Sequence, residues 1–176
     1  MNDLDRLFRT YHQPLVRYLT RRLGDRDWAE EVAQETFLRA LKQENIVSER
    51  AWLFAVATNL VRDEARKDSR RRRRLEILRE QSRAEEIVEP EPLTIERAEE
   101  AAFARKALEA LGERDREALL MREEGLNYIE IANALELSVS SVGTTLARAR
   151  RRLVEAYEQL QGVGSGGKGG GTHAAS

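Results

Sequence analysis

Residues 125–153 carry the pattern that decides the fold of the second half of the chain, GLNYIEIANALELSVSSVGTTLARARRRL. Asn127 and Glu130 have the spacing of a helix-capping pair, and apolar residues recur after them at helical intervals. Glu136-Leu137 predicts a tight turn, after which Ser138 can cap a final, longer helix. A short helix, a turn of a few residues and a second helix together predict a helix-turn-helix.

The final helix is expected to have one packing face and one free face. At about 100° per residue, one narrow stripe is apolar and packs on the preceding helices: Val142, Leu146, Ala149, Leu153, Tyr157 and Leu160. The opposite side carries Ser140, Thr144, Ala147 and Arg151, flanked by Arg148 and Arg152. Small polar residues near its start let such a helix enter the major groove of DNA, where arginines reach phosphates or guanine edges. The alternative interpretation is a helical hairpin with an exposed basic face.

The N-terminal part is expected to contain four helical segments. Apolar residues recur at helical spacing from Leu4 to Tyr11, and Pro14 is expected to open a second segment, because proline suits a first helical turn. Asp27 followed by Glu30 resembles a capping box for the third segment, and Ser48 can cap the fourth. The third segment is expected to bury one stripe: Val32, Ala33, Thr36, Phe37, Ala40 and Leu41.

Charge is strongly segregated along the chain although the net charge is only -1. Residues 62–74 are strongly basic, residues 80–100 are strongly acidic, and Glu89-Pro90-Glu91-Pro92 ends the helical pattern. We therefore expect an all-α protein of two small helical domains, at 1–75 and 95–161. An acidic flexible linker is expected at 76–94, and a disordered glycine-rich tail at 162–176.

Composition excludes several classes of protein. Hydrophobic residues make up 41% and charged residues 35% of the 176 residues, which favours small helical cores over a deep enzyme cavity. The chain has no cysteine and only two distant histidines, so we expect neither disulfides, metal site, cofactor nor catalytic set. No apolar run approaches the roughly 18 residues of a membrane span, so we expect a cytoplasmic protein without membrane insertion.

The stretch AEEVAQETFLRA at residues 29–40 resembles the core-polymerase-binding helix of bacterial sigma factors. AWLFAVATNLVRD at 51–63, with the arginines that follow, is similar to the family's helix for the minus-ten (-10) promoter element. LGERDREA at 111–118 and GLNYIEIA at 125–132 are similar to its minus-thirty-five (-35) domain. With three motifs in register over roughly residues 4–160, the chain resembles the extracytoplasmic-function (ECF) group of the sigma-70 family.

This resemblance implies a function without chemistry of its own. The chain would bind core RNA polymerase through its largest and second-largest subunits, direct it to the -10 and -35 elements of promoter DNA, and help to open the strands. The polymerase-binding surface would be a polar ridge beside a leucine, suited to a basic and partly apolar partner: Glu31, Gln34, Glu35 and Leu38. Because the family usually has an anti-sigma factor, such a partner is also expected.

The resemblance also implies two DNA-binding residue sets. Contacts to the -10 element are expected from the loop at 43–47, which would pocket a flipped base, and from the next helix: Asn45, Asn59, Asp63, Arg66, Arg70 and Arg71. Family members often carry Lys or Arg where this chain has Gly143 and Thr145. Recognition of the -35 element is therefore expected to depend on Ser140, Ser141, Thr144, Arg148 and Arg151.

Two other functions stay open at this point. A free-standing helix-turn-helix regulator would bind duplex DNA tightly without polymerase and would show two-fold symmetry. An adaptor or anti-sigma-like protein would use the same helices without contacting DNA.

Overall fold

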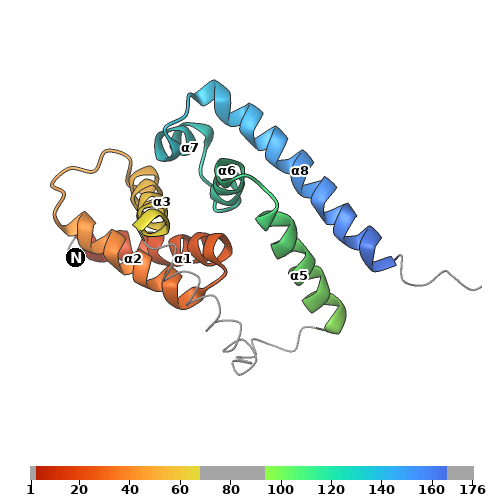
Figure 1. Ribbon diagram of the computed structural model, residues 1–176. Coiled ribbons are helices and arrows are strands. Elements are labelled where there is room, and N and C mark those ends of the chain that lie inside the picture. The colour runs from red at the N-terminus through yellow and green to blue at the C-terminus, as the bar shows by residue number, and fades with distance from the viewer. Residues whose placement is uncertain (1–2, 68–93, 166–176) are drawn as a thin grey trace, which may run out of the picture.

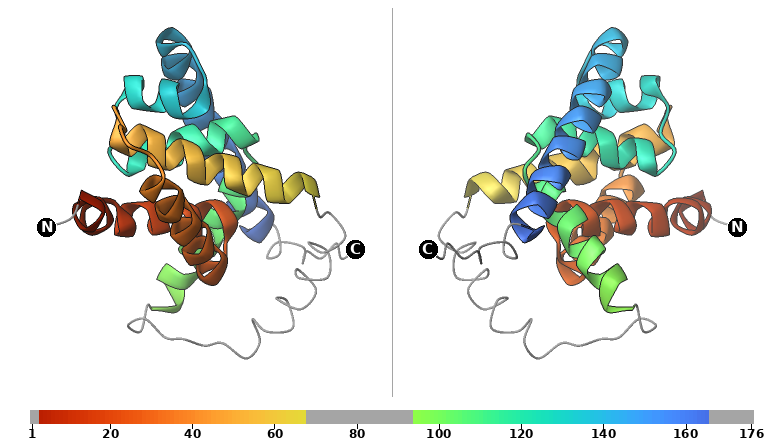
Figure 2. Two further views of the ribbon diagram at one scale, coloured as in Figure 1. Left: turned by 90° about the vertical axis from the view of Figure 1, so that its left-hand side faces the viewer. Right: turned by 90° about the vertical axis from the view of Figure 1, so that its right-hand side faces the viewer.

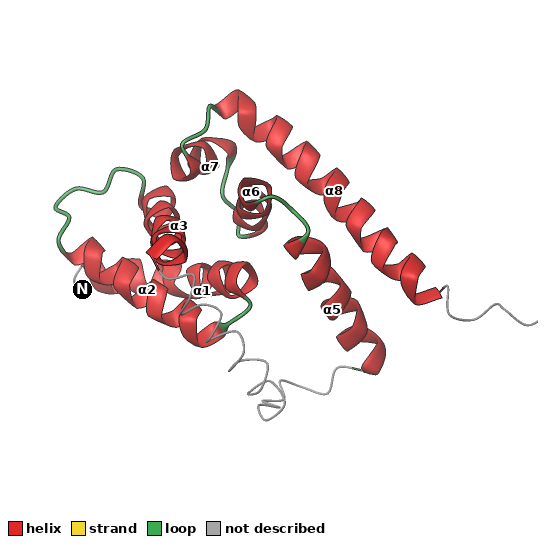
Figure 3. Ribbon diagram, viewed as in Figure 1, coloured by secondary structure: helices red, strands yellow, loops and turns green. Residues whose placement is uncertain are grey.

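The computed structural model describes residues 3–67 and 94–165, and every regular element within these ranges is a helix (Figures 1 and 3). The N-terminal domain consists of α1 (Asp3–Leu23), α2 (Arg26–Leu41) and α3 (Glu49–Lys67). The C-terminal domain consists of α5 (Ile95–Glu109), α6 (Glu113–Glu123), α7 (Tyr128–Leu135) and α8 (Val139–Ser165). The expected all-α architecture is confirmed for the described residues. Most of the expected linker and tail lies outside them.

Pro14 lies inside α1 and does not begin a new helix, so the prediction of a separate second segment was wrong. A proline in a helix interior costs roughly 3 kcal/mol, mainly through a lost hydrogen bond and a ring clash. The turns that follow bury four side chains against α2 and α3, and this burial offsets the cost: Leu15, Val16, Tyr18 and Leu19.

Two details of α2 also differ from expectation. Asp25, not Asp27, is the N-cap, and its side chain accepts a hydrogen bond of 2.9 Å from the backbone N–H of Trp28. The buried stripe runs from Ala29 to Ala40 as the periodicity predicts, but Leu41 is 55% exposed. The stripe ends one residue early because Leu41 is the last residue of the helix, where the chain turns into the loop before α3.

The helix-turn-helix forms as predicted. Gly125, with φ +89°, turns the chain between α6 and α7, and Asn127 and Glu130 form a complete capping box for α7. Glu136 adopts a left-handed conformation with φ 55° in the turn before α8, and the Ser138 hydroxyl accepts a hydrogen bond of 3.2 Å from the Ser141 N–H. The α8 helix continues to Ser165, beyond the expected domain end at Gln161.

The two domains pack directly against each other: α3 contacts α7, and α1 contacts α6 (Figures 1 and 2). One cluster of buried apolar side chains includes residues from both domains, where composition had favoured several separate small cores. The arrangement places the helix-turn-helix beside the helix expected to contact the -10 element.

Candidate nucleic-acid and protein interfaces

The four residues expected to bind polymerase lie on the exposed side of α2: Glu31, Gln34, Glu35 and Leu38. Spacings of three and four residues place them on one face of the helix. Glu35 accepts a hydrogen bond of 3.2 Å from Nε of Arg39, and Leu38 is 54% exposed. The face therefore offers acceptor oxygens beside an apolar side chain, which suits a basic and partly apolar partner.

Two further exposed apolar side chains lie at or beside α2: Leu41 of α2 itself and Phe8 of α1. Leu41 is exposed one turn beyond Leu38, and Phe8 of α1 is 43% exposed. The Phe8 ring stacks on His12 with a centroid distance of 4.3 Å and lies 5.2 Å from the ring of Phe37. The contact with Phe37 fixes Phe8 beside α2. The helical spacing of the apolar residues around Phe8 does not reveal from the sequence that the Phe8 ring packs beside α2.

The residues expected to contact the -10 element are only partly described. Asn45 is exposed in the loop between α2 and α3, and Asn59 and Asp63 are exposed one turn apart on α3. The structure therefore brings Asn59 and Asp63 onto one accessible surface. Arg66 belongs to α3, but its side chain lies outside the described residues, as do Arg70 and Arg71 entirely.

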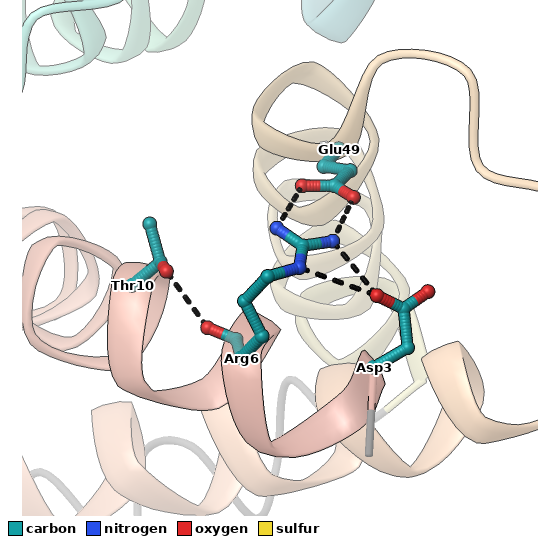
Figure 4. Close-up of polar contacts among 4 residues, drawn as sticks. All are labelled: Asp3, Arg6, Thr10 and Glu49. Atoms are coloured by element: carbon teal, nitrogen blue, oxygen red, sulfur yellow. Dashed lines mark hydrogen bonds and ion pairs between the residues drawn. The ribbon is translucent and has the colours of Figure 1, made fainter. Parts of the chain in front are cut away.

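A cavity of about 160 Å³ lies beneath the loop that connects α2 and α3. Gln43, Glu44 and Ile46 line it from the loop, Leu4 from α1, and Glu49 from the start of α3. Arg6 holds one wall in place: its guanidinium bonds to Glu49 and donates 3.0 and 3.2 Å hydrogen bonds to Asp3 (Figure 4). The loop thus covers a hollow that both polar and apolar side chains line.

The free face of α8 forms as the periodicity predicts. Ser140, Thr144 and Arg151 are exposed, while Val142 and Leu146 are fully buried. Ser141, which was also predicted to contact the -35 element, is half-buried near the helix start. Its hydroxyl lies 2.6 Å from that of Ser138, so Ser141 belongs to the cap as well as to the edge of this face.

Arg148 is bound within its own domain. Its Nε and Nη2 donate hydrogen bonds of 2.7–3.2 Å to the buried carboxylate of Asp115 in α6, and Arg152 adds one of 3.3 Å. These hydrogen bonds hold the pKa of Asp115 below its usual range. Arg148 is still 39% exposed, so Asp115 positions it at the edge of the free face of α8.

The two departures from the family pattern occupy different environments. Thr145 is buried, with 6% exposure, so it lies on the packing side of α8 and not on the free face. Gly143 lies against the ring of Tyr128, where an added Cβ would sit 3.7 Å from the ring. That spacing is ordinary contact, so a larger side chain at position 143 would extend from beside Tyr128.

A set of ion pairs that the sequence does not reveal connects the two domains. Arg50 donates two hydrogen bonds of 2.7 Å to Glu130, and Nη2 of Arg62 donates bonds of 2.8 and 3.2 Å to Glu117. Glu117 is fully buried, and this burial raises its pKa, while Arg62 acts in the opposite direction. Glu117 belongs to a helix whose other buried residues are mostly apolar, but its burial and its partner become visible only in the folded structure.

No helix in the described ranges is long and apolar enough to cross a membrane. No group of three or more His, Cys, Asp or Glu side chains there is arranged to hold a metal ion.

Comparisons with known proteins match both domains. Residues 7–71 match the family model for Sigma-70 region 2, and residues 104–153 match that for Sigma-70, region 4. The chain is 30% identical over 157 residues to RNA polymerase sigma factor YlaC of Bacillus subtilis, covering 86% of this chain and 90% of that protein. It is 32% identical over 148 residues to the ferric citrate uptake sigma factor FecI of Escherichia coli, covering 81% and 84%.

A solved structure has the same fold. It is the sigma factor RpoE in complex with the anti-sigma factor NepR from Bartonella quintana, with a TM-score of 0.65 and 20% identity, over 90% of this chain and 98% of that one.

Proposed function

We propose, because the chain belongs to the sigma-70 family of RNA polymerase sigma factors and to its ECF group, that its two domains bind different parts of the polymerase–promoter complex. The protein is a transcription initiation factor: it directs RNA polymerase to promoters. The catalytic step belongs to the polymerase, and this chain supplies binding and positioning.

The N-terminal domain binds core polymerase through α2 in this proposal. The observation that carries it is the exposed row Glu31, Gln34, Glu35 and Leu38, continued by Phe8 and Leu41. Carboxylates around an apolar centre fit the coiled-coil clamp that the family binds on the largest polymerase subunit. The second-largest subunit is the further contact that the family resemblance implies. An anti-sigma factor, as bound to RpoE, is a proposed partner as well.

Promoter DNA contacts both domains. Asn59 and Asp63 of α3 face the -10 element, with Arg66, Arg70 and Arg71 proposed to bind phosphates of the separating strand. The cavity beneath the loop that carries Asn45 takes a flipped base, and its polar lining offers hydrogen-bond partners for the base edge.

At the other end of the promoter, the free face of α8 reads the -35 element in the major groove. The residues proposed for this contact are Ser140, Ser141, Thr144, Arg148 and Arg151.

Co-migration with core RNA polymerase on size exclusion tests the polymerase surface. The full-length chain should co-migrate, and the double variant Glu35→Lys/Leu38→Ala should not. A matched control, Glu158→Lys/Val154→Ala, makes one identical charge reversal and one similar apolar truncation at exposed positions of α8 and should retain binding. If the wild-type chain stays apart from polymerase and instead binds duplex promoter DNA as a two-fold symmetric dimer, it is a free-standing regulator and the proposal is wrong.

A further inference from the structure

Three buried arginine nitrogens lie around the first turns of α6, and none of them has a hydrogen-bond acceptor in the described part of the chain. They are the Nε atoms of Arg22 in α1, Arg62 in α3 and Arg116 in α6 itself. A buried donor without an acceptor is costly, so folded proteins rarely keep several of them together. These N–H groups therefore require an acceptor from outside the chain, which is either water or an anion.

Ion pairs to α6 fix two of these arginines close to each other. Nη2 of Arg22 lies 2.9 Å from Oε1 of Glu113. One turn further along α6, Nη2 of Arg62 lies 2.8 Å from Oε1 of Glu117. Residues four apart are neighbours on a helix, so the two guanidinium groups are anchored about one turn apart. Arg116 lies between the two glutamates in sequence, and the tilt of helical side chains toward the N-terminus directs it back over the first turn.

Positive charge is incompletely neutralised at this place. Burial, and then the nearby charge of Arg22, lowers the pKa of Arg116 from its ordinary value. Of the three carboxylates that act on Arg116 or Arg22, Glu117 is buried, while Glu109 and Glu113 are exposed and their charges are screened by water. Water satisfies a hydrogen bond but does not neutralise a charge, so the excess of positive charge favours an anion as the missing acceptor.

The N-terminus of α6 adds donors of its own. Its N-cap is Gly112, which has no side chain to accept a hydrogen bond from the first turn. The first backbone N–H groups of a helix have no partner within it, and they carry a partial positive charge that favours anions. Arg22 lies at this turn through its bond to Glu113, the first residue of α6, and its side chain is only 9% exposed. Backbone and side-chain donors thus lie at the same turn.

Glu113 already supplies an anionic group at this turn. Its side chain is 52% exposed, so it can turn into solvent and leave Nη2 of Arg22 to a ligand. A phosphate group has more acceptor oxygens than a carboxylate, and it binds arginine side chains through two parallel hydrogen bonds. Phosphate can therefore replace Glu113 at Arg22 and bond to the Nε atom as well.

We propose that the start of α6 binds the phosphate group of a small molecule, through Arg22, Arg116 and the backbone N–H groups of the first turn. Glu113 occupies the place of the phosphate when no ligand is bound. The donors are buried between helices, where the backbone of a DNA duplex cannot approach, so the ligand is a small phosphate compound. None of these residues is proposed to bind polymerase or promoter DNA, so the inference goes beyond the proposed function.

Isothermal titration calorimetry of the full-length chain with inorganic phosphate, at constant ionic strength, tests the site. Glu113→Gln removes the competing charge and should bind phosphate about tenfold more tightly than wild type. Glu123→Gln, at an exposed position near the other end of the same helix, is the matched control and should bind like wild type. Arg116→Gln removes a donor and should weaken binding about tenfold, whereas Arg105→Gln, at an exposed position of α5, should not.

Urea midpoints without phosphate show whether each variant is folded. Arg116→Lys is a second variant, which keeps the positive charge but lacks the planar group of donors, and it should weaken binding as well. Titration with a nucleoside diphosphate identifies the source of the phosphate: tighter binding than inorganic phosphate assigns the site to a nucleotide, and equal or weaker binding assigns it to free phosphate.

Two results would overturn the inference. One is a wild-type chain that binds neither inorganic phosphate nor the nucleoside diphosphate. The other is phosphate binding that is the same in wild type, Glu113→Gln and Arg116→Gln, since the anion would then bind elsewhere on the chain.

Discussion

The fully buried carboxylate of Glu117 in α6 accepts hydrogen bonds of 2.8 and 3.2 Å from Nη2 of Arg62 in α3, across the boundary between the two domains. Burial makes the charged form of Glu117 costly, and the pair with Arg62 offsets part of that cost. Glu117 therefore links the protonation of one side chain to the contact between the domains.

Glu117 should make the domain contact depend on pH. Its pKa is raised in the folded protein, so its contribution is fully present below the ordinary glutamate value of about 4.3 and is lost as pH rises through the raised value. The Glu117→Gln variant stays neutral, so wild type should lose stability relative to it as pH rises above about 4.3 and through the raised pKa of Glu117. Urea midpoints of both proteins measure this difference.

Comparing wild type with Glu117→Gln separates the pH dependence due to Glu117 from that of the other carboxylates at the domain contact. Arg50 lowers the pKa of Glu130, so that carboxylate weakens the contact as pH falls, the opposite direction, but equally in both proteins. A wild-type-minus-variant difference that stays flat across this range would contradict the prediction.

Asp115→Asn should destabilise the C-terminal domain. The substitution removes the charge that Arg148 and Arg152 share, at a buried position. The expected loss in the free energy of unfolding is about 1–2 kcal/mol, below the value for a fully buried pair because Arg148 is 39% exposed. Urea denaturation measures this loss, with Glu123→Gln on the exposed side of α6 as the control. An equal loss in both variants would show that the ion pairs of Asp115 with Arg148 and Arg152 do not stabilise the domain.

Asn127→Ala should remove the N-cap of α7. Its side chain accepts a 2.8 Å hydrogen bond from the Glu130 N–H, and the Glu130 side chain accepts a 3.0 Å bond from the Asn127 N–H. Losing the first bond should cost about 1 kcal/mol in the free energy of unfolding. Asn133→Ala, at an exposed position inside the same helix, should be neutral or slightly stabilising. Comparable losses from both would show that the cap contributes nothing specific.

Arg151→Ala should weaken binding of the holoenzyme to the -35 element. Arg151 is exposed on the free face of α8, and losing a base contact should lower affinity about tenfold and relax specificity at one position. If Arg151 binds a phosphate, affinity should fall for all sequences and the salt slope should decrease by about 1. Competition binding at several salt concentrations separates the two, with Arg105→Ala of α5 as the control. No change in affinity or slope would exclude Arg151 from the interface.

Local features of the fold could be predicted because their causes are local. The capping box at Asn127 and Glu130 and the buried stripe through Val142 and Leu146 depend on residues within a few turns of each other. Pro14 shows the limit of this reasoning. A start signal for a helix is also compatible with a helix interior when the following turns are buried against other helices.

The residues of the candidate site also fall into two groups, those that helical periodicity predicts and those that depend on contacts between distant parts of the chain. The exposed faces of α2 and α8 follow from helical periodicity, so Glu35 and Arg151 could be placed on them in advance. The pairing of Arg62 with Glu117 joins positions 55 residues apart on two domains. Neither residue type nor spacing identifies such a partner, since a charged residue on a helix is most often solvated.

Gly125 lies at the turn between α6 and α7, close to a side chain of the other domain. Its φ of +89° is accessible to glycine and strained for other residues, and an added Cβ would lie 3.7 Å from Nη1 of Arg50. A substitution here would strain the turn of the DNA-reading motif, while the added Cβ would make only an ordinary contact with the side chain of Arg50 in the opposite domain. Position 125 should therefore be intolerant of substitution because of its backbone conformation alone, and a variant selected to repair the turn should leave the domain boundary undisturbed.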